Sequence, residues 1–255
     1  MYVATWNVNS IHAREERVLT WLEANEPDVC CLQELKVVDE KFPREAVRAL
    51  GYQVETHGQR TYNGVAILSR EPLSDVERGF GDGEDDEQAR FLAATTTGVR
   101  IMCAYMPNGQ AVGSEKYAYK LRWFERLTAY LDQRLDPTAP ALLCGDFNVA
   151  PADLDVYDPE GWEGSVLCSA DERAALEKVL GDRLIDVVRC LHPETQLFSW
   201  WDYRQLGFPK NRGLRIDHIV ATPPLAERAL DAGVDREARK GKQPSDHAPV
   251  WARFR

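Results

Sequence analysis

Ala141-Leu142-Leu143-Cys144-Gly145-Asp146-Phe147-Asn148 is an apolar run that ends in a carboxylate and an amide. The run predicts a buried strand, and Asp146 and Asn148 then lie where that strand meets a turn. The sequence repeats this arrangement near its end, where Ser245-Asp246-His247 precedes Ala248-Pro249-Val250-Trp251. A strand end holds a carboxylate still without burying it, which is what a site for a hard divalent cation requires.

Strand-like and helical patterns alternate on both sides of this run. The clearest helix is expected over residues 114–135, with Lys116, Lys120 and Glu125 facing outward from its apolar stripe. Shorter helices are predicted over residues 14–24, 43–50 and 171–180. Strands are predicted over residues 3–8, 29–32, 52–56, 64–69, 73–78, 90–97, 99–105, 141–144, 198–203, 214–221 and 248–254. This order predicts an α/β fold of two packed sheets with helices outside, in one domain spanning residues 1–255.

The composition indicates a protein of the reducing cytosol. Apolar residues make up 44% of the 255 residues and can form a substantial core. Residues 1–7 contain neither the basic leader nor the apolar segment of a secretory signal, and no apolar run approaches the ~20 residues that span a bilayer. The six cysteines form no Cys-x-x-Cys pair and are interpreted as buried small hydrophobes. We therefore expect a cytoplasmic protein without a membrane partner.

Charge is distributed unevenly along the chain. The net charge of −10 has the wrong sign for general nucleic-acid binding, yet residues 200–255 carry 11 Lys and Arg against 7 Asp and Glu. One basic stretch contains Arg204, Lys210, Arg212 and Arg215, and a second covers residues 236–242. The pattern is typical both of an enzyme that grips a phosphate backbone locally and of a solvated charged face.

Five polar clusters fall at predicted strand ends. They are Asn7, Gln33 with Glu34, Asp146 with Asn148, Asp217, and Asp246 with His247. Each alone is typical of a turn residue or a helix cap. Brought to one rim, they supply four carboxylates, at least two amides and one imidazole, and hard oxygen ligands favour magnesium or manganese over zinc. Asp217 is a candidate to orient the ring of His247.

Two further motifs each have two interpretations. Tyr105-Met106-Pro107-Asn108-Gly109 is either an ordinary turn after a strand or a phenol and an amide aimed at phosphate oxygens. Phe198-Ser199-Trp200-Trp201-Asp202-Tyr203-Arg204 is either core or an aromatic wall beside cations, suited to the faces of sugars or bases.

Together, these motifs resemble the exonuclease III class of apurinic/apyrimidinic endonucleases, within the endonuclease/exonuclease/phosphatase superfamily. Glu34, Asp146-x-Asn148 and Ser245-Asp246-His247 match the wider superfamily. The aromatic block at 198–204 and Asn211-Arg212-Gly213-Leu214-Arg215-Ile216-Asp217 match the exonuclease III branch. The resemblance runs essentially from end to end, although residues 157–170 fit it poorly and receive no role.

The resemblance implies a DNase I-like, four-layered α/β sandwich with the site at one edge. It also implies a metal-dependent DNA phosphodiesterase of base excision repair that cleaves 5′ to abasic sites, cleans 3′ ends and acts as a 3′→5′ exonuclease on duplex DNA. Mg²⁺ or Mn²⁺ would be the cofactor, and double-stranded DNA with abasic or blocked 3′ ends the substrate. A member of bacterial type is expected to be a cytoplasmic monomer that reaches the nucleoid through DNA.

The same resemblance gives each candidate residue an expected role. The metal ligands would be Asn7, Glu34, Asp146, Asn148, Asp246 and His247. The catalytic residues would be Tyr105, Asp146, Asn148, Asp217 and His247, with either Asp146 or His247 as the general base. The DNA or phosphate contacts would be Asn108, Lys116, Arg212 and Arg215. The pocket for an extruded abasic sugar would be formed by Trp200, Leu214 and Ile216.

Three alternatives compete with this interpretation. A lipid or inositol phosphatase, or a nonspecific nuclease, on the same scaffold would not need the aromatic wall with Arg212 and Arg215. A non-catalytic DNA-binding module would have eroded metal positions, whereas Glu34, Asp146 and His247 are all present. A metal-independent protein that binds acidic partners has no motif in its favour.

Overall fold

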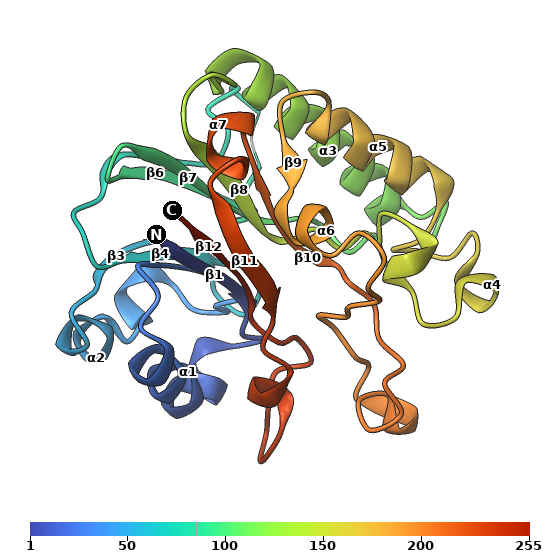
Figure 1. The fold of residues 1–255 in the computed structure, drawn as a ribbon, viewed down its shortest axis with the longest axis horizontal. Helices are drawn as coiled ribbons and strands as arrows, with labels where there is room; N and C mark the ends of the chain where they lie inside the picture. The colour runs from blue at the N-terminus through green and yellow to red at the C-terminus, as the bar shows by residue number, and fades with distance from the viewer. Residues whose placement is uncertain (85) are drawn as a thin grey trace.

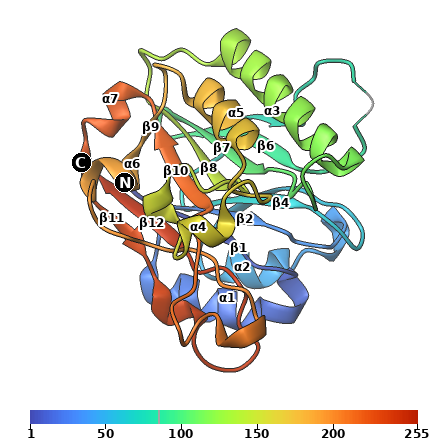
Figure 2. The same ribbon diagram turned by 90° about the vertical axis from the view of Figure 1, so that its right-hand side faces the viewer.

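The structure of the chain, a computed structural model, describes residues 1–84 and 86–255. Within these residues the strands form two six-stranded mixed sheets that lie face to face (Figures 1 and 2). The first sheet contains, in spatial order, β11 (Ala229–Val234), β12 (Val250–Phe254), β1 (Tyr2–Asn7), β2 (Val29–Gln33), β4 (Val65–Ser69) and β3 (Gln53–His57). The second contains β5 (Ser74–Arg78), β6 (Phe91–Thr96), β7 (Val99–Tyr105), β8 (Ala141–Asp146), β10 (Asp217–Ala221) and β9 (Ile185–Asp186).

Helices cover the outer face of each sheet (Figure 1). The first sheet is covered by α1 (Ile11–Asn25) and α2 (Arg44–Ala49), and the second by α3 (Glu115–Arg134) and α5 (Ala170–Leu180). The shorter helices are α4 (Pro159–Trp162), α6 (Val187–Leu191), α7 (Pro223–Ala226), η1 (Asp39–Lys41), η2 (Asp153–Asp155), η3 (Arg204–Leu206) and η4 (Arg236–Arg239). The order helices, sheet, sheet, helices confirms the predicted four-layered α/β sandwich.

Both faces of the central strands are buried, which explains their unbroken apolar runs. In β4, Val65 and Ile67 point into the core between the sheets, whereas Ala66 and Leu68 pack under α1 and α2. In β8, Leu142 and Cys144 point into the same central core, and Leu143 packs under α3 and α5. Since side chains alternate along a strand, each strand serves two layers of core at once.

The late strands depart from prediction. Residues 198–203 were expected to form a strand, but in this stretch Trp200 makes isolated bridges to Leu214 and His247 and no ladder extends from them. The reason is packing, because Phe198 and Trp201 turn into a separate apolar cluster with Ala248. The strand expected at 214–221 begins at Asp217, and the sequence patterns missed β11.

Two side chains expected at other depths also need correction. Lys120 was expected to face solvent from α3, but its side chain is fully buried. Cys190 was interpreted as a buried hydrophobe, but it is exposed. In the described residues, helices lack the length and apolar character needed to cross a bilayer.

Candidate active site

Strand pairing brings the distant polar clusters to one edge of the sandwich. In the first sheet, Asn7 at the end of β1 lies beside Gln33 at the end of β2. In the second sheet, Asp146 at the end of β8 pairs with Tyr105 on one side and with Asp217 on the other. The register of both sheets therefore sets the relative positions of these groups.

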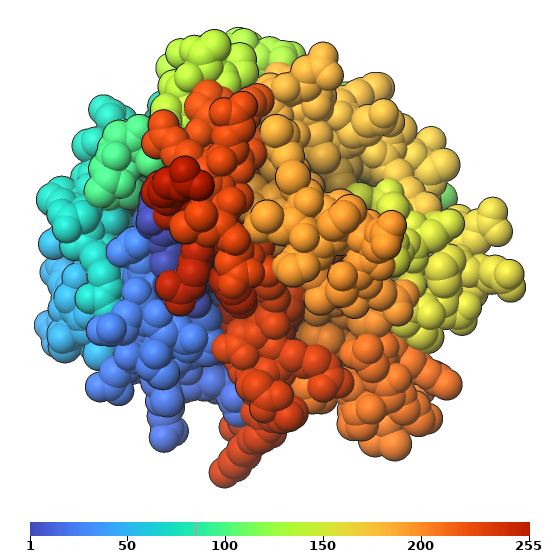
Figure 3. Space-filling view, viewed as in Figure 1, coloured from blue at the N-terminus to red at the C-terminus, as the bar shows by residue number. Residues whose placement is uncertain are grey.

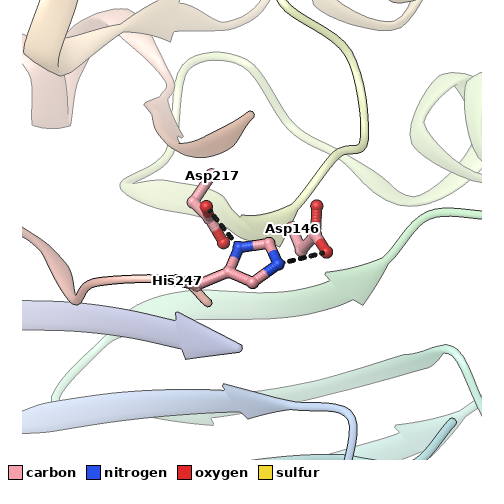
Figure 4. Close-up of side chains that lie close together, drawn as sticks. All are labelled: Asp146, Asp217 and His247. Atoms are coloured by element: carbon pink, nitrogen blue, oxygen red, sulfur yellow. Dashed lines mark hydrogen bonds and ion pairs between the residues drawn. The ribbon is translucent and has the colours of Figure 1, made fainter. Parts of the chain in front are cut away.

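His247 is held by carboxylates on both ring nitrogens (Figure 4). Its Nδ1 lies 2.8 Å from Asp217 Oδ2, and its Nε2 lies 3.7 Å from Asp146 Oδ2. Asp217 Oδ2 also accepts a 2.6 Å hydrogen bond from the Ser199 hydroxyl, so this carboxylate is fixed in turn. The geometry assigns the Nδ1 proton to the bond with Asp217 and leaves Nε2 facing Asp146.

Asn7 links the carboxylates of the two sheets. Its Nδ2 donates to Asp146 Oδ2 at 2.9 Å and to Glu34 Oε1 at 3.2 Å. Glu34 Oε1 also accepts a 2.6 Å hydrogen bond from the Tyr105 hydroxyl, and its Oε2 lies 2.9 Å from Lys36 Nζ. Glu34, Asp146 and His247 thus belong to one connected group.

Burial and charge set the protonation of this group. Burial lowers the pKa of His247, but the carboxylates of Asp217 and Asp146 outweigh it and raise the pKa to about 10. Burial raises the pKa of Asp146 to about 7, against the opposing charge of His247. Burial acts in the same direction on Glu34, but Lys36 and the Tyr105 hydroxyl hold the pKa of Glu34 below its usual value. At neutral pH His247 is therefore a cation and Glu34 an anion within this group.

Two amides lie beside Asp146. Asn148 has a left-handed backbone (φ 51°), and its backbone N–H donates to Asp146 Oδ1 at 2.9 Å. Its side-chain Nδ2 donates to the Met106 carbonyl oxygen at 3.0 Å, and its Oδ1 accepts from Asn108 Nδ2 at 3.0 Å. Asn108 and Asn148 consequently form one amide pair next to the carboxylate.

Asp246 lies on the other side of Glu34. Its Oδ1 accepts from Asn9 Nδ2 at 3.0 Å, and its Oδ2 accepts from Trp200 Nε1 at 3.1 Å. Lys36 Nζ donates to Asn9 Oδ1 at 2.6 Å and also pairs with Glu34, so it connects the two acidic groups. Lys36 and Ser199 are site residues whose part in this network the sequence did not indicate.

The structure contradicts the expected role of Arg215. Its side chain is 1% exposed and donates at 2.6 Å to Asp155 Oδ1 and at 2.7 Å to Asp186 Oδ2. A guanidinium buried between two carboxylates is not available to DNA. Arg212 and Lys116 are exposed, and Lys116 lines a groove of about 650 Å³ together with Asn108.

The expected sugar pocket also needs revision. Leu214 and Ile216 are almost fully buried and pack beneath Trp200 rather than lining open space. Trp200 is half-buried and meets Trp162 edge-on, with 6.4 Å between ring centroids. Trp162 belongs to the segment that received no role from the sequence, and it forms a half-buried aromatic wall with Trp200.

A buried histidine–aspartate pair beside a cluster of hard oxygen donors, on a two-sheet sandwich, is the arrangement of a metal-dependent phosphohydrolase. The chain belongs to the endonuclease/exonuclease/phosphatase family, which matches residues 4–247. It is 38% identical to exodeoxyribonuclease III of Haemophilus influenzae over 100% of both chains. The structure of the 3′ phosphatase NExo from Neisseria bound to product DNA hairpin is similar, with a TM-score of 0.97, 44% identity and coverage of 100% of this chain and 99% of that chain. An AP endonuclease from Archaeoglobus fulgidus gives a TM-score of 0.96, with 41% identity and the same coverage.

Members of this family are metal-dependent, and the site here has suitable donors. In the part of the chain that the structure describes, Asp146, Asp217 and His247 place donor atoms within 4.8 Å of one another. Asp217 Oδ1 is buried and has no hydrogen-bond partner among the described residues. Carboxylate oxygens of this kind fit a hard divalent cation.

Proposed function

We propose that the chain is a DNA phosphodiesterase of base excision repair that cleaves 5′ to abasic sites, cleans 3′ ends and acts as a 3′→5′ exonuclease on duplex DNA. The observation that carries the proposal is the convergence of Glu34, Asp146 and His247 on one edge. The full-length similarity to exodeoxyribonuclease III supports DNA as the substrate. The similarity to an AP endonuclease and to a 3′ phosphatase supports abasic sites and blocked 3′ ends as its targets.

The proposed cofactor is Mg²⁺ or Mn²⁺. We place it on the Glu34 and Asn7 side of Asp146, because His247 Nδ1 and Asp217 already satisfy each other through a hydrogen bond. Asp246 is the remaining proposed ligand, and it is linked to the Glu34 side of the site through Asn9 and Lys36. When bound, the cation supplies positive charge that offsets the negative charge developing on the phosphate oxygens.

The chain's own groups divide the remaining work. Asp146 accepts the proton of the attacking water, because its pKa, raised to about 7 by burial, suits a base that works near neutral pH. His247 is charged and donates from Nε2 to a phosphate oxygen, which its raised pKa of about 10 supports. This charge argues against His247 as the general base. The amides of Asn108 and Asn148 hold phosphate oxygens, and the Tyr105 hydroxyl lies next to the metal-binding carboxylate.

Two factors favour a nucleotide without a base, namely the small free-energy cost of flipping it out and the room beside the aromatic wall. An abasic nucleotide leaves the helix with little loss of stacking, and Trp200 with Trp162 forms the wall against which its sugar packs. We expect Trp200→Ala to reduce the preference for abasic over intact duplex. The ratio of kcat/KM values on the two duplexes measures it, and an unchanged ratio contradicts the pocket.

One assay tests the activity itself. A series of matched duplexes carries an abasic site, a 3′-phosphate, a mismatched 3′ end or uracil, and each is incubated with MgCl₂, MnCl₂ or EDTA. We expect cleavage of the first three with either cation and none with EDTA. Hydrolysis of an inositol or lipid phosphate without cleavage of any duplex would instead support the alternative phosphatase.

We further propose that the protein acts as a monomer in the cytoplasm. The acidic body with a few exposed cations, such as Arg204 and Arg212, fits an enzyme that grips DNA locally and releases it. Light scattering after size exclusion tests the oligomeric state, and a dimer mass contradicts it.

A further inference from the structure

A fully buried lysine lies directly behind the two amides of the site. Lys120 extends from α3, and its Nζ donates to the backbone carbonyl oxygens of Asn148 at 2.7 Å and of Asn108 at 3.1 Å. Its third bond goes to Glu172 Oε1, and neither side chain of this ion pair is exposed. A lysine ammonium has three donors, so these partners use all of them.

Glu172 anchors the pair to the start of α5. Its Oε1 accepts from the Leu167 backbone N–H at 3.0 Å, and its Oε2 accepts from the Ser169 backbone N–H at 3.1 Å and hydroxyl at 2.5 Å. Ser169 in turn caps α5 and bonds to Tyr117 of α3 at 2.7 Å. The pair therefore joins two helices to the turns that follow β7 and β8.

Stability alone does not account for this arrangement. Replacing a buried ion pair by apolar residues of similar volume is often neutral or stabilising. What an apolar residue cannot replace is the donor for the two carbonyl oxygens, to which no other group of the described residues donates a hydrogen bond. Because these carbonyls point inward to Lys120, the peptide units of Asn108 and Asn148 have fixed orientations.

We propose that Lys120, balanced by Glu172, is a positioning residue that holds the backbones of Asn108 and Asn148 so that both amides meet the scissile phosphate. The proposal rests on the proposed function, since it assumes a phosphate at these amides. Lys120 touches neither the substrate nor the reacting atoms. It acts through the Asn108–Asn148 amide pair, which is 3.0 Å across its hydrogen bond.

The test removes the pair as a unit. The double variant Lys120→Met/Glu172→Gln deletes the cation without leaving a buried unpaired carboxylate. We expect it to unfold cooperatively, with kcat on the abasic duplex about 10- to 100-fold lower and KM changed much less. A stable double variant with parental kcat overturns the proposal.

A matched control removes an ion pair near the start of β7, the strand whose other end leads to Asn108. Arg100 near the start of β7 pairs with Glu77 at 3.0 Å, and Arg100→Met leaves the amides in place. We expect this variant to lose stability and to keep parental kcat. An equal fall in kcat in both variants means that general destabilisation explains the result, and the proposal is then wrong.

A second measurement does not need activity. In metal-free protein, the side-chain NH₂ signals of Asn108 and Asn148 in ¹⁵N–¹H spectra should shift in Lys120→Arg, which keeps the charge but moves the donors. We expect kcat to fall in this variant with the melting temperature close to that of the parent. Shifted amide signals with parental kcat overturn the proposal even where the double variant does not fold. If the parent protein cleaves no duplex, the proposed function fails, and unshifted signals separately decide against the positioning role.

Discussion

At the scale of single residues, the site depends on His247 being charged. The imidazole contacts Asp217 at 2.8 Å and lies 3.7 Å from Asp146, and the latter carboxylate shares Asn7 with Glu34. The members of such a chain titrate together, because the charge on each group affects the protonation of its neighbour. Changes at one residue should therefore be visible at the next.

The first prediction concerns the pKa of His247 in metal-free protein. Asp217→Asn removes the strongest opposing charge and should lower this pKa from about 10 by about 1 to 3. In the parent, the folded pKa lies above the unfolded value of about 6.5, so the charged ring stabilises the fold fully below that pH. This contribution is lost as the pH rises through about 10, and less of it exists in the variant. An NMR titration of the imidazole measures the change, and an unaltered pKa contradicts the pairing.

The second prediction concerns the general base. Asp146→Asn preserves the hydrogen bond from the Asn148 backbone N–H and removes the proton acceptor, so kcat should fall at least about 100-fold with the fold intact. Steady-state kinetics on an abasic duplex measure it. Asp153→Asn is the control, since that carboxylate is exposed and pairs with Arg173 on the surface. Near-parental turnover by Asp146→Asn would assign the base elsewhere.

Sequence reasoning placed the polar residues of the site but missed the groups that hold them. Asn7, Glu34 and Asp146 follow an apolar run and His247 precedes one, a signal that the local sequence contains. Ser199 contacts Asp217, 18 residues away, and Lys120 contacts Asn148, 28 residues away. The sequence next to Ser199 and Lys120 does not indicate these contacts. Lys120 occupies an exposed-looking position in a helical pattern, and its depth is set by α5, which packs over it.

At the scale of secondary-structure elements, Arg215 anchors the residues that directly precede β10. Its guanidinium joins Asp155 and Asp186, while its backbone N–H donates to the Asp155 carbonyl oxygen at 2.9 Å. The bonds fix the segment that ends at Asp217. Strand β10 therefore pairs with β8 in one register, which places Asp217 opposite Asp146.

The third prediction follows from this contact. Arg215→Met removes the buried cation that Asp155 and Asp186 share, although Arg189 still pairs with Asp155, and should lower the free energy of unfolding by about 3 kcal/mol. Urea denaturation measures the loss. Arg204→Met is the matched control, because Arg204 is 85% exposed and its removal should leave stability close to that of the parent. Equal effects in both variants would refute the structural role of Arg215.

Strands with two buried faces were predictable from the sequence, whereas segments whose structure depends on contacts with distant residues were not. Strands such as β4 and β8 are short apolar runs bounded by turns, and their pattern is sufficient. Residues 198–203 are equally apolar, but their aromatic rings pack in different directions and no neighbouring strand completes a ladder. The edge strand β11 (Ala229–Val234) is partly exposed and carries a bulge, so it lacks an apolar signature.

At the scale of the whole molecule, acidic groups gathered from both sheets repel one another without a cation. Glu34, Asp146, Asp217 and Asp246 all lie at this edge, and of the described cations Lys36 and His247 offset part of their charge. Divalent metal should therefore bind the folded chain and stabilise it.

The fourth prediction measures that stabilisation. Adding MgCl₂ or MnCl₂ to about 100 times the dissociation constant should raise the free energy of unfolding by about 2.7 kcal/mol, and EDTA should remove the gain. Thermal melts with and without cation measure it, and Glu34→Gln is the control that should respond less. Identical melts of the parent with metal and with EDTA contradict a metal site in the folded protein.

The two ends of the chain share one sheet, because β1 and β12 pair. Figure 3 shows the red C-terminal segment close to the blue N-terminal residues. Tyr2 pairs with Arg253, and His247 shortly precedes β12, which completes that pairing. During translation, His247 is thus made after Asn7, Glu34, Asp146 and Asp217. A ribosome that stalls earlier releases a fragment that lacks both the histidine and the strand covering β1. Interrupted synthesis should therefore yield an unfolded fragment that proteases degrade, rather than a partly active enzyme that could cut the chromosome.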